Sequence, residues 1–172
     1  MRDPDNRARA AYLVLGLGNE LFTDEGVGVA AARRLARLAL PGVEVLDGGT
    51  LGLALLPELV GRDGLLLLDA LVQPGGRPGQ VAVLEGAELP GAHALLTSAH
   101  QLGVIDALAA AELAGQAPRR VAAVGMVPAS LETGYGLTPL ATASLDEMVA
   151  RAVAVLAAWP ASASPKEAVG HA

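Results

Sequence analysis

The distribution of apolar residues along the chain predicts alternating strands and helices. Short, largely apolar runs bounded by Gly, Pro or charged residues are typical of strands buried in a sheet. Segments in which apolar residues recur every three or four positions are typical of amphipathic helices. The predicted strands span residues 12–17, 43–46, 65–68, 80–84 and 120–127. The predicted helices span about residues 24–40, 52–60, 101–114 and 139–158.

The first and last helices each have a clear apolar face. In the first, arginines at 33, 34 and 37 lie on or beside the polar face. The residues expected to point inward from it are Val27, Ala31, Leu35 and Leu38. Those expected to point inward from the last helix are Leu140, Leu145, Met148, Val149, Ala152, Val153 and Leu156.

The order of these elements predicts an α/β protein with a three-layer α/β/α sandwich. Strands that alternate with helices favour a mostly parallel sheet covered on both faces. Only a loop rich in Pro and Gly separates the strand at 65–68 from the strand at 80–84. A parallel crossover needs an intervening helix, so we expect the fourth strand to be antiparallel and at an edge.

Length and composition predict one folded domain. The chain has 172 residues, of which 52% are hydrophobic and only 2% aromatic, so aliphatic side chains must fill the core. We place a single domain at 11–159, between a disordered lead-in at 1–10 and a disordered Ala/Ser/Pro tail at 160–172.

Charge and residue usage exclude several classes of function. The net charge of −6 and a single lysine argue against a nucleic-acid surface, and the lack of cysteine excludes disulfides, thiolate metal sites and a thiol nucleophile. The charged N-terminus lacks the apolar core of a signal peptide. No apolar run reaches the roughly 18 residues of a membrane helix. We therefore expect a soluble, cytoplasmic protein with no membrane contact.

Gly16 and Gly18 follow the first strand, where a dinucleotide-binding loop would lie. The third glycine of that motif is missing, because Leu21 stands at its position. Asp24 and Glu25 then place negative charge where a pyrophosphate would bind. The pattern therefore argues against nucleotide binding, and no Walker loop is present.

Carboxylates follow the first three strands, where an open α/β sheet binds its ligands. Glu25, Asp47, Asp69 and His100 would share this edge, and two or three carboxylates with one imidazole suit a divalent metal. Each also has a structural alternative. Asp24 and Glu25 would cap a helix, Asp47 would stabilise a turn, Asp69 would bind loop amides, and His100 would simply begin a helix.

Other catalytic arrangements have little support in the sequence. There is no G-x-S-x-G nucleophile elbow and no H-E-x-x-H helix. Ser98 is a weak nucleophile candidate beside His100. His93 is expected to face solvent, and His171 lies in the tail.

Several blocks together resemble the hydrogenase maturation endopeptidases, which process the large subunit of nickel–iron hydrogenases. The first block, at 16–28, reads Gly-Leu-Gly-Asn-Glu-Leu-Phe-Thr-Asp-Glu-Gly-Val-Gly. The others, in order, are Leu-Asp-Gly-Gly-Thr at 46–50, Leu-Asp-Ala at 68–70, Ser-Ala-His-Gln-Leu-Gly at 98–103, and Val-Gly-Met-Val-Pro at 124–128 with Gly-Leu-Thr-Pro at 136–139. They span roughly residues 12–158.

The resemblance implies a fold, a reaction and a site. The family fold is a three-layer sandwich whose five strands have the order 2-1-3-5-4, with strand 4 antiparallel. Members remove a short C-terminal extension from the large subunit once nickel is inserted, which activates the hydrogenase, and they are grouped with aspartic-type peptidases. The metal-contacting and catalytic positions fall on Glu25, Asp69 and His100, and Asp47 matches a substrate-recognition position. Some members have Asp where this chain has Glu25.

We therefore hypothesise that nickel arrives bound to the large-subunit precursor and that the protein holds no permanent cofactor. A carboxylate acting as general base, or metal-polarised water or carbonyl, would fit the chemistry. The alternatives are a peptidase of the same fold acting on another protein, such as a spore-protein protease, and a non-enzymatic metal-sensing module. We expect a monomer.

Overall fold

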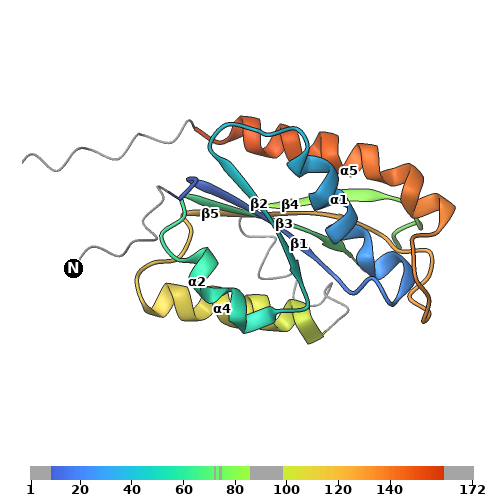
Figure 1. The fold of residues 1–172 in the computed structure, drawn as a ribbon, viewed down its shortest axis with the longest axis horizontal. Coiled ribbons are helices and arrows are strands. Elements are labelled where there is room, and N and C mark those ends of the chain that lie inside the picture. Colours follow the sequence, from blue (N-terminus) through green and yellow to red (C-terminus); the bar gives the residue numbers. More distant parts are fainter. Residues whose placement is uncertain (1–8, 72, 74, 86–98, 161–172) are drawn as a thin grey trace, which may run out of the picture.

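The centre of the protein is a five-stranded sheet (Figure 1). The computed structural model describes residues 9–71, 73, 75–85 and 99–160, with only the backbone of 99–102. The strands are β1 (Tyr12–Leu17), β2 (Val43–Gly49), β3 (Gly64–Ala70), β4 (Val81–Glu85) and β5 (Arg120–Met126). Their order is β2-β1-β3-β5-β4, and only β4 is antiparallel to its neighbour. The predicted order and the antiparallel edge strand are confirmed.

Helices cover both faces of the sheet, which confirms the three-layer sandwich. α1 (Val27–Ala36) and α5 (Pro139–Ala158) lie on one face, while α2 (Leu56–Leu59) and α4 (Ala99–Leu113) lie on the other (Figure 1). Two 3-10 turns, η1 (Thr23–Gly26) and η2 (Gly52–Leu55), connect strands to helices. Within the described ranges, no helix has the length and apolar character needed to cross a bilayer.

Alternate residues of the strands fill two separate cores. In β1, Val14 packs on the side of α1 and α5, whereas Leu13 and Leu15 pack on the side of α2 and α4. The same alternation divides Leu66 from Leu65 in β3. Because side chains along a strand point to opposite faces in turn, a continuous apolar run serves both cores.

Three details of the predicted helices are wrong: the bounds of the first helix and the inward positions of Leu38 and Leu140. The first helix is shorter than 24–40, because residues 23–26 form the turn η1 and α1 ends at Ala36. Ala39 adopts a left-handed φ of 47°, which ends the helical path and leaves Leu38 51% exposed. Leu140, at the start of α5, is 45% exposed instead of inward-facing.

Gly16 and Gly28 let α1 approach the sheet closely. A Cβ atom on Gly16 would lie 2.5 Å from the Cβ of Ala32, in α1. A Cβ on Gly28 would lie 2.1 Å from the carbonyl oxygen of Leu68 and 2.4 Å from that of Leu17. These glycines therefore allow close helix–sheet packing.

We expect Gly28→Ala to destabilise the protein by about 3 kcal/mol, because the new methyl group meets backbone oxygens that cannot rotate away. Urea denaturation would measure the change. An ordinary Gly→Ala change inside a helix stabilises by about 0.5–1 kcal/mol. If Gly28→Ala stabilised the protein by such an amount, the result would show that α1 can move off the sheet.

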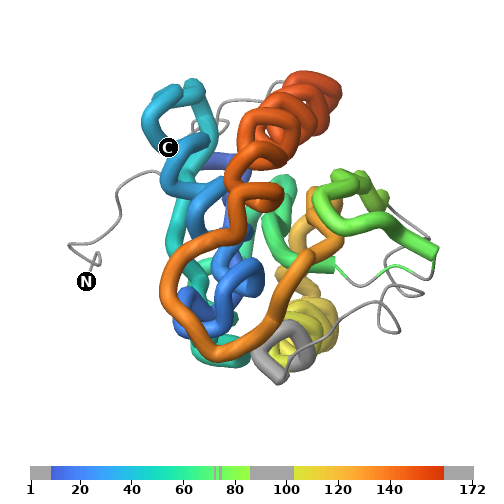
Figure 2. Tube along the Cα trace, turned by 90° about the vertical axis from the view of Figure 1, so that its right-hand side faces the viewer, coloured from blue at the N-terminus to red at the C-terminus, as the bar shows by residue number. Residues whose placement is uncertain are grey.

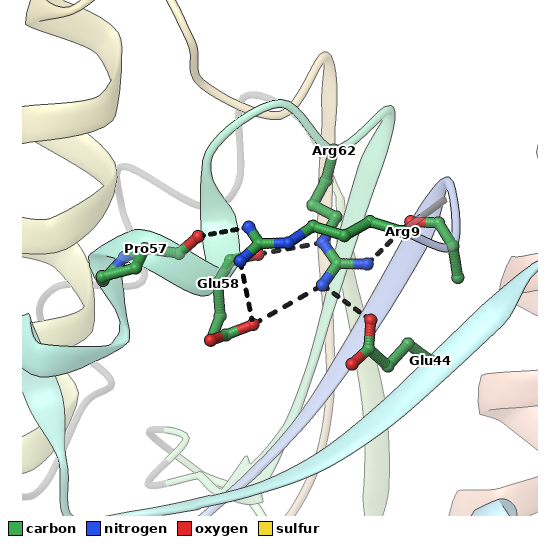
Figure 3. A network of polar contacts seen from close by, with 6 residues as sticks. Arg9, Glu44, Pro57, Glu58 and Arg62 are labelled. Carbon is green, nitrogen blue, oxygen red and sulfur yellow. Dashed lines mark hydrogen bonds and ion pairs between the residues drawn. The ribbon is translucent and has the colours of Figure 1, made fainter. Parts of the chain in front are cut away.

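The buried side chain of Arg62 contacts several segments at the edge of the sheet where β1 and β3 begin (Figure 3). The Arg62 side chain is 1% exposed, and its Nη2 lies 2.7 Å from Glu44 Oε2 and 3.7 Å from Glu58 Oε2. Its Nε donates to the carbonyl of Glu58 at 2.9 Å, and its Nη1 to that of Ala10 at 2.7 Å. These contacts hold the chain before β1 against β2 and α2.

Both ends of the described domain lie at the edge of the sheet where β1 begins. Tyr12 packs its ring on Trp159 with the centroids 5.2 Å apart, and its hydroxyl donates to the carbonyl of Pro160. Arg9, within the predicted lead-in, donates from Nη1 to the carbonyl of Pro57 at 2.6 Å. Residues 1–8 and 161–172 lie outside the described part of the chain.

Candidate functional site

Glu25 and Asp69 come from segments that contact each other at the carboxyl edge of the sheet. Glu25 is half-buried in η1, which follows β1 and contacts β3. Gly28, just beyond η1, lies directly against the carbonyl of Leu68. The residue after Leu68 is Asp69. The structure therefore places the turn that carries Glu25 beside the end of the strand that carries Asp69.

Asp69 is a buried acid within a strand that is otherwise apolar. Its side chain is almost fully enclosed, at 3% exposure, and its Oδ1 accepts a hydrogen bond from the amide of Ala70 at 2.7 Å. Across the sheet it is paired with Gly125, which adds no side chain to the edge. The structure therefore places a buried carboxylate at the carboxyl edge of the sheet, where an open α/β sheet binds its ligands.

The backbone of α4 begins at the same edge of the sheet. Gly103, in the second turn of α4, packs so closely on η2 that a Cβ there would lie 2.7 Å from Gly52 Cα. η2 follows the carboxyl end of β2, so the start of α4, with His100, lies on this side. The side chain of His100 is outside the described residues, as are Ser98, His93 and His171. Its part in the site stays a prediction.

Asp24, beside Glu25, has a different role from its neighbour. It is fully buried, and its carboxylate accepts hydrogen bonds from the amides of Ala129, Ser130 and Thr138 at 2.9, 3.2 and 2.8 Å, and from the Thr138 hydroxyl at 3.0 Å. It makes no capping hydrogen bond to its own turn. The interpretation of Asp24 as a cap of its own helix is therefore wrong.

Further hydrogen bonds, from the backbone and from the Thr23 hydroxyl, join this part of the chain to the loop at 128–138. Thr23 donates from its amide to the carbonyl of Gly134 at 2.9 Å and from its hydroxyl to the carbonyl of Ser130 at 2.8 Å. Gly134 in turn donates to the carbonyl of Leu21 at 2.9 Å. Figure 2 shows the loop in orange beside the blue segment that follows β1. Thr23 has a φ of 43°, a strained value for a β-branched residue, which these contacts hold.

Asp47 is at the same edge but belongs to a separate group of charges. It lies in β2, in register with Gly16, and its Oδ2 accepts from Arg33 Nη2 at 2.9 Å. Arg33 also binds Glu20, and this carboxylate, supported by Asp47, raises the pKa of Arg33 above its ordinary value. Over the described ranges, no three His, Asp or Glu side chains form a metal-binding group. The variant of the predicted site with three carboxylates is therefore not seen.

The sequence pattern does not reveal the roles of two residues at this edge, Asp24 and Arg33. Helix-start statistics favour Asp24 as a cap, and its one further signal is that it is a second carboxylate directly beside Glu25. Helical periodicity places Arg33 on or beside the polar face of its helix and says nothing of its partners. Its position on α1, above the ends of β1 and β2, is a consequence of the parallel order of the strands.

The order and direction of the strands define an α/β fold that this chain shares with solved endopeptidase structures. The structure is similar to the hydrogenase maturating endopeptidase HybD from Escherichia coli, with a TM-score of 0.78, 38% identity, and coverage of 85% of this chain and 91% of that one. It is also similar to the [NiFe] hydrogenase maturation protease HybD from Thermococcus kodakarensis, with a TM-score of 0.70, 31% identity, and coverage of 84% and 97%.

The sequence comparisons point to the same family. The family model described as hydrogenase maturation protease matches residues 29–155. The hydrogenase 2 maturation protease of Escherichia coli strain K12 is 40% identical over 159 residues, which cover 91% of this chain and 97% of the relative. HupD, a hydrogenase expression/formation protein of Rhodobacter capsulatus, is 42% identical over 151 residues, or 86% and 71%.

The chain belongs to the hydrogenase maturation protease family, and it is a peptidase of that family. The predicted resemblance is confirmed. The same comparisons favour hydrogenase maturation over the two alternatives, a spore-protein protease and a metal-sensing module without enzymatic activity.

Proposed function

We propose that this peptidase removes a short C-terminal extension from the large-subunit precursor of a nickel–iron hydrogenase after nickel insertion. The observation that carries the proposal is the contact between the turn of Glu25 and the end of β3, where the buried Asp69 lies. The packing of α4 on η2, which follows β2, supports including His100, at the start of α4. The names of the relatives, which refer to hydrogenase maturation, support this substrate.

Nickel enters this proposal as cargo of the substrate. The carboxylates of Glu25 and Asp69 and the imidazole of His100 form a set of oxygen and nitrogen donors that suits a divalent transition metal. Three protein donors leave coordination positions for ligands from the precursor. Docking would therefore be strongest when the precursor already holds the ion, and no permanently bound cofactor is part of the proposal.

The chemical step is hydrolysis of a peptide bond in the precursor. In line with the aspartic-type grouping, a carboxylate of the site acts as general base toward water, or the ion in the substrate polarises the water or the carbonyl. Asp47 contacts the precursor outside the reacting atoms. We propose that the protein acts in the cytoplasm as a monomer.

Incubation with nickel-loaded and nickel-free precursor tests the function directly. We expect intact-mass spectrometry to show a shortened large subunit and a released peptide only with the nickel-loaded form. Equal cleavage of both forms would contradict nickel recognition but would still support the peptidase function. Cleavage of neither form by correctly folded protein would reject the proposed substrate.

A further inference from the structure

One arginine joins carboxylates from two separate segments at the edge of the candidate site. Arg33, in α1, donates from Nη1 to Glu20 Oε1 at 2.6 Å and from Nη2 to Glu20 Oε2 at 2.9 Å. Its Nη2 also donates to Asp47 Oδ2 at 2.9 Å. Glu20 lies in the segment between β1 and η1, whereas Asp47 lies in β2. We refer to Glu20, Arg33 and Asp47 as the charge cluster.

The exposure of the charge cluster argues against stability as its main effect. The side chains of Arg33, Glu20 and Asp47 are 51%, 35% and 45% exposed. Ion pairs with this much solvent access contribute little to folding, because water screens the charges and ordering long side chains is unfavourable. A bidentate guanidinium–carboxylate pair does, however, fix geometry, because both groups are planar.

The charge cluster is also in contact with the turn that carries Glu25. Glu20 packs against Gly26, where a Cβ atom would lie 3.0 Å from Glu20 Cα and 3.1 Å from Glu20 Cγ. Gly26 directly follows Glu25 in η1. Arg33 therefore links Asp47 to the backbone that positions Glu25.

We propose that Arg33 is a positioning residue that sets the affinity for the precursor by fixing Asp47 and bracing the turn of Glu25. The inference rests on the proposed function. The charge cluster contains two carboxylates and one guanidinium, so its net charge is −1. Loss of Arg33 leaves two unpaired carboxylates that repel each other, so Asp47 would no longer be held for contact with the incoming polypeptide.

The test compares Arg33→Met, Arg33→Lys and Arg34→Met on nickel-loaded precursor. Arg34 is the matched control, because it is the next residue of α1, is 39% exposed, and pairs with Asp146 outside the charge cluster. We expect Arg33→Met to raise KM about tenfold and to change kcat by less than about twofold, because substrate binding and not the chemical step is affected. Arg33→Lys should recover part of the loss, and Arg34→Met should match the wild type.

A double-mutant cycle with Asp47→Asn separates positioning from a general effect. We expect the KM effects of Arg33→Met and Asp47→Asn to be strongly non-additive, with unchanged thermal unfolding midpoints. Additive effects, an effect confined to kcat, or a wild-type KM in Arg33→Met would overturn the inference while leaving the proposed function intact. Wild-type protein that neither binds nor cleaves the precursor would reject both.

Discussion

Alanine at Glu25, Asp69 or His100 should reduce processing of the nickel-loaded precursor by at least about 1,000-fold. Each substitution removes one of the few donors that the proposed site offers to the ion in the substrate, and the remaining two would neither hold it nor orient the scissile bond. Mass spectrometry of the released peptide over time measures the rate. Asp106→Ala, an exposed acid on α4, is the control and should process normally.

Folding must be separated from catalysis in this series. Asp69 is 3% exposed, so its removal also changes packing. Glu25→Gln keeps the shape of a half-buried side chain and removes only its charge, so this variant should fold normally and still be inactive. Normal processing by folded His100→Ala or Glu25→Gln would show that the site has been assigned to the wrong residues.

Asp24→Ala should lower the free energy of unfolding by about 4 kcal/mol. The substitution leaves three backbone amides and the Thr138 hydroxyl without the buried carboxylate that now accepts from them. The loop at 128–138 would then separate from η1, and processing would fall because Glu25 lies in that turn. Urea denaturation gives the stability, and hydrogen exchange at the amides of Ala129 and Thr138 should speed up.

An exposed acid provides the comparison for Asp24. Asp146 is 87% exposed and pairs with Arg34, so Asp146→Ala should change stability by less than about 0.5 kcal/mol. A loss of under about 1 kcal/mol in Asp24→Ala would mean that water replaces the carboxylate readily, and that Asp24 does not hold the loop.

Local pattern was enough to predict the layers of the fold. Buried parallel strands are apolar on both faces, so the runs at 12–17 and 65–68 were recognisable, and both match observed strands. The missing helix between β3 and β4 predicted the antiparallel edge strand, because chain connectivity alone forbids the parallel crossover there. The strand order itself came from the family resemblance, since periodicity does not determine which strands are neighbours.

The partners of the side chains at the site could not be predicted from the local sequence pattern. The start of the first helix was misjudged, because acidic residues before an apolar stripe look the same in a helix and in a 3-10 turn. The partners of Arg33 were not predictable from its helix, because Glu20 and Asp47 reach it only when β1 and β2 lie side by side.

The class of fold, the family and the candidate acids follow from the amino-acid sequence alone, because these depend on periodicity, connectivity and local motifs. Long-range packing, in contrast, turns Asp24 inward while its neighbour Glu25 remains half-buried at the edge. The difference arises from distance along the chain. The groups that bind Asp24 are more than 100 residues away, at 129, 130 and 138, and only the packed fold brings them to its carboxylate.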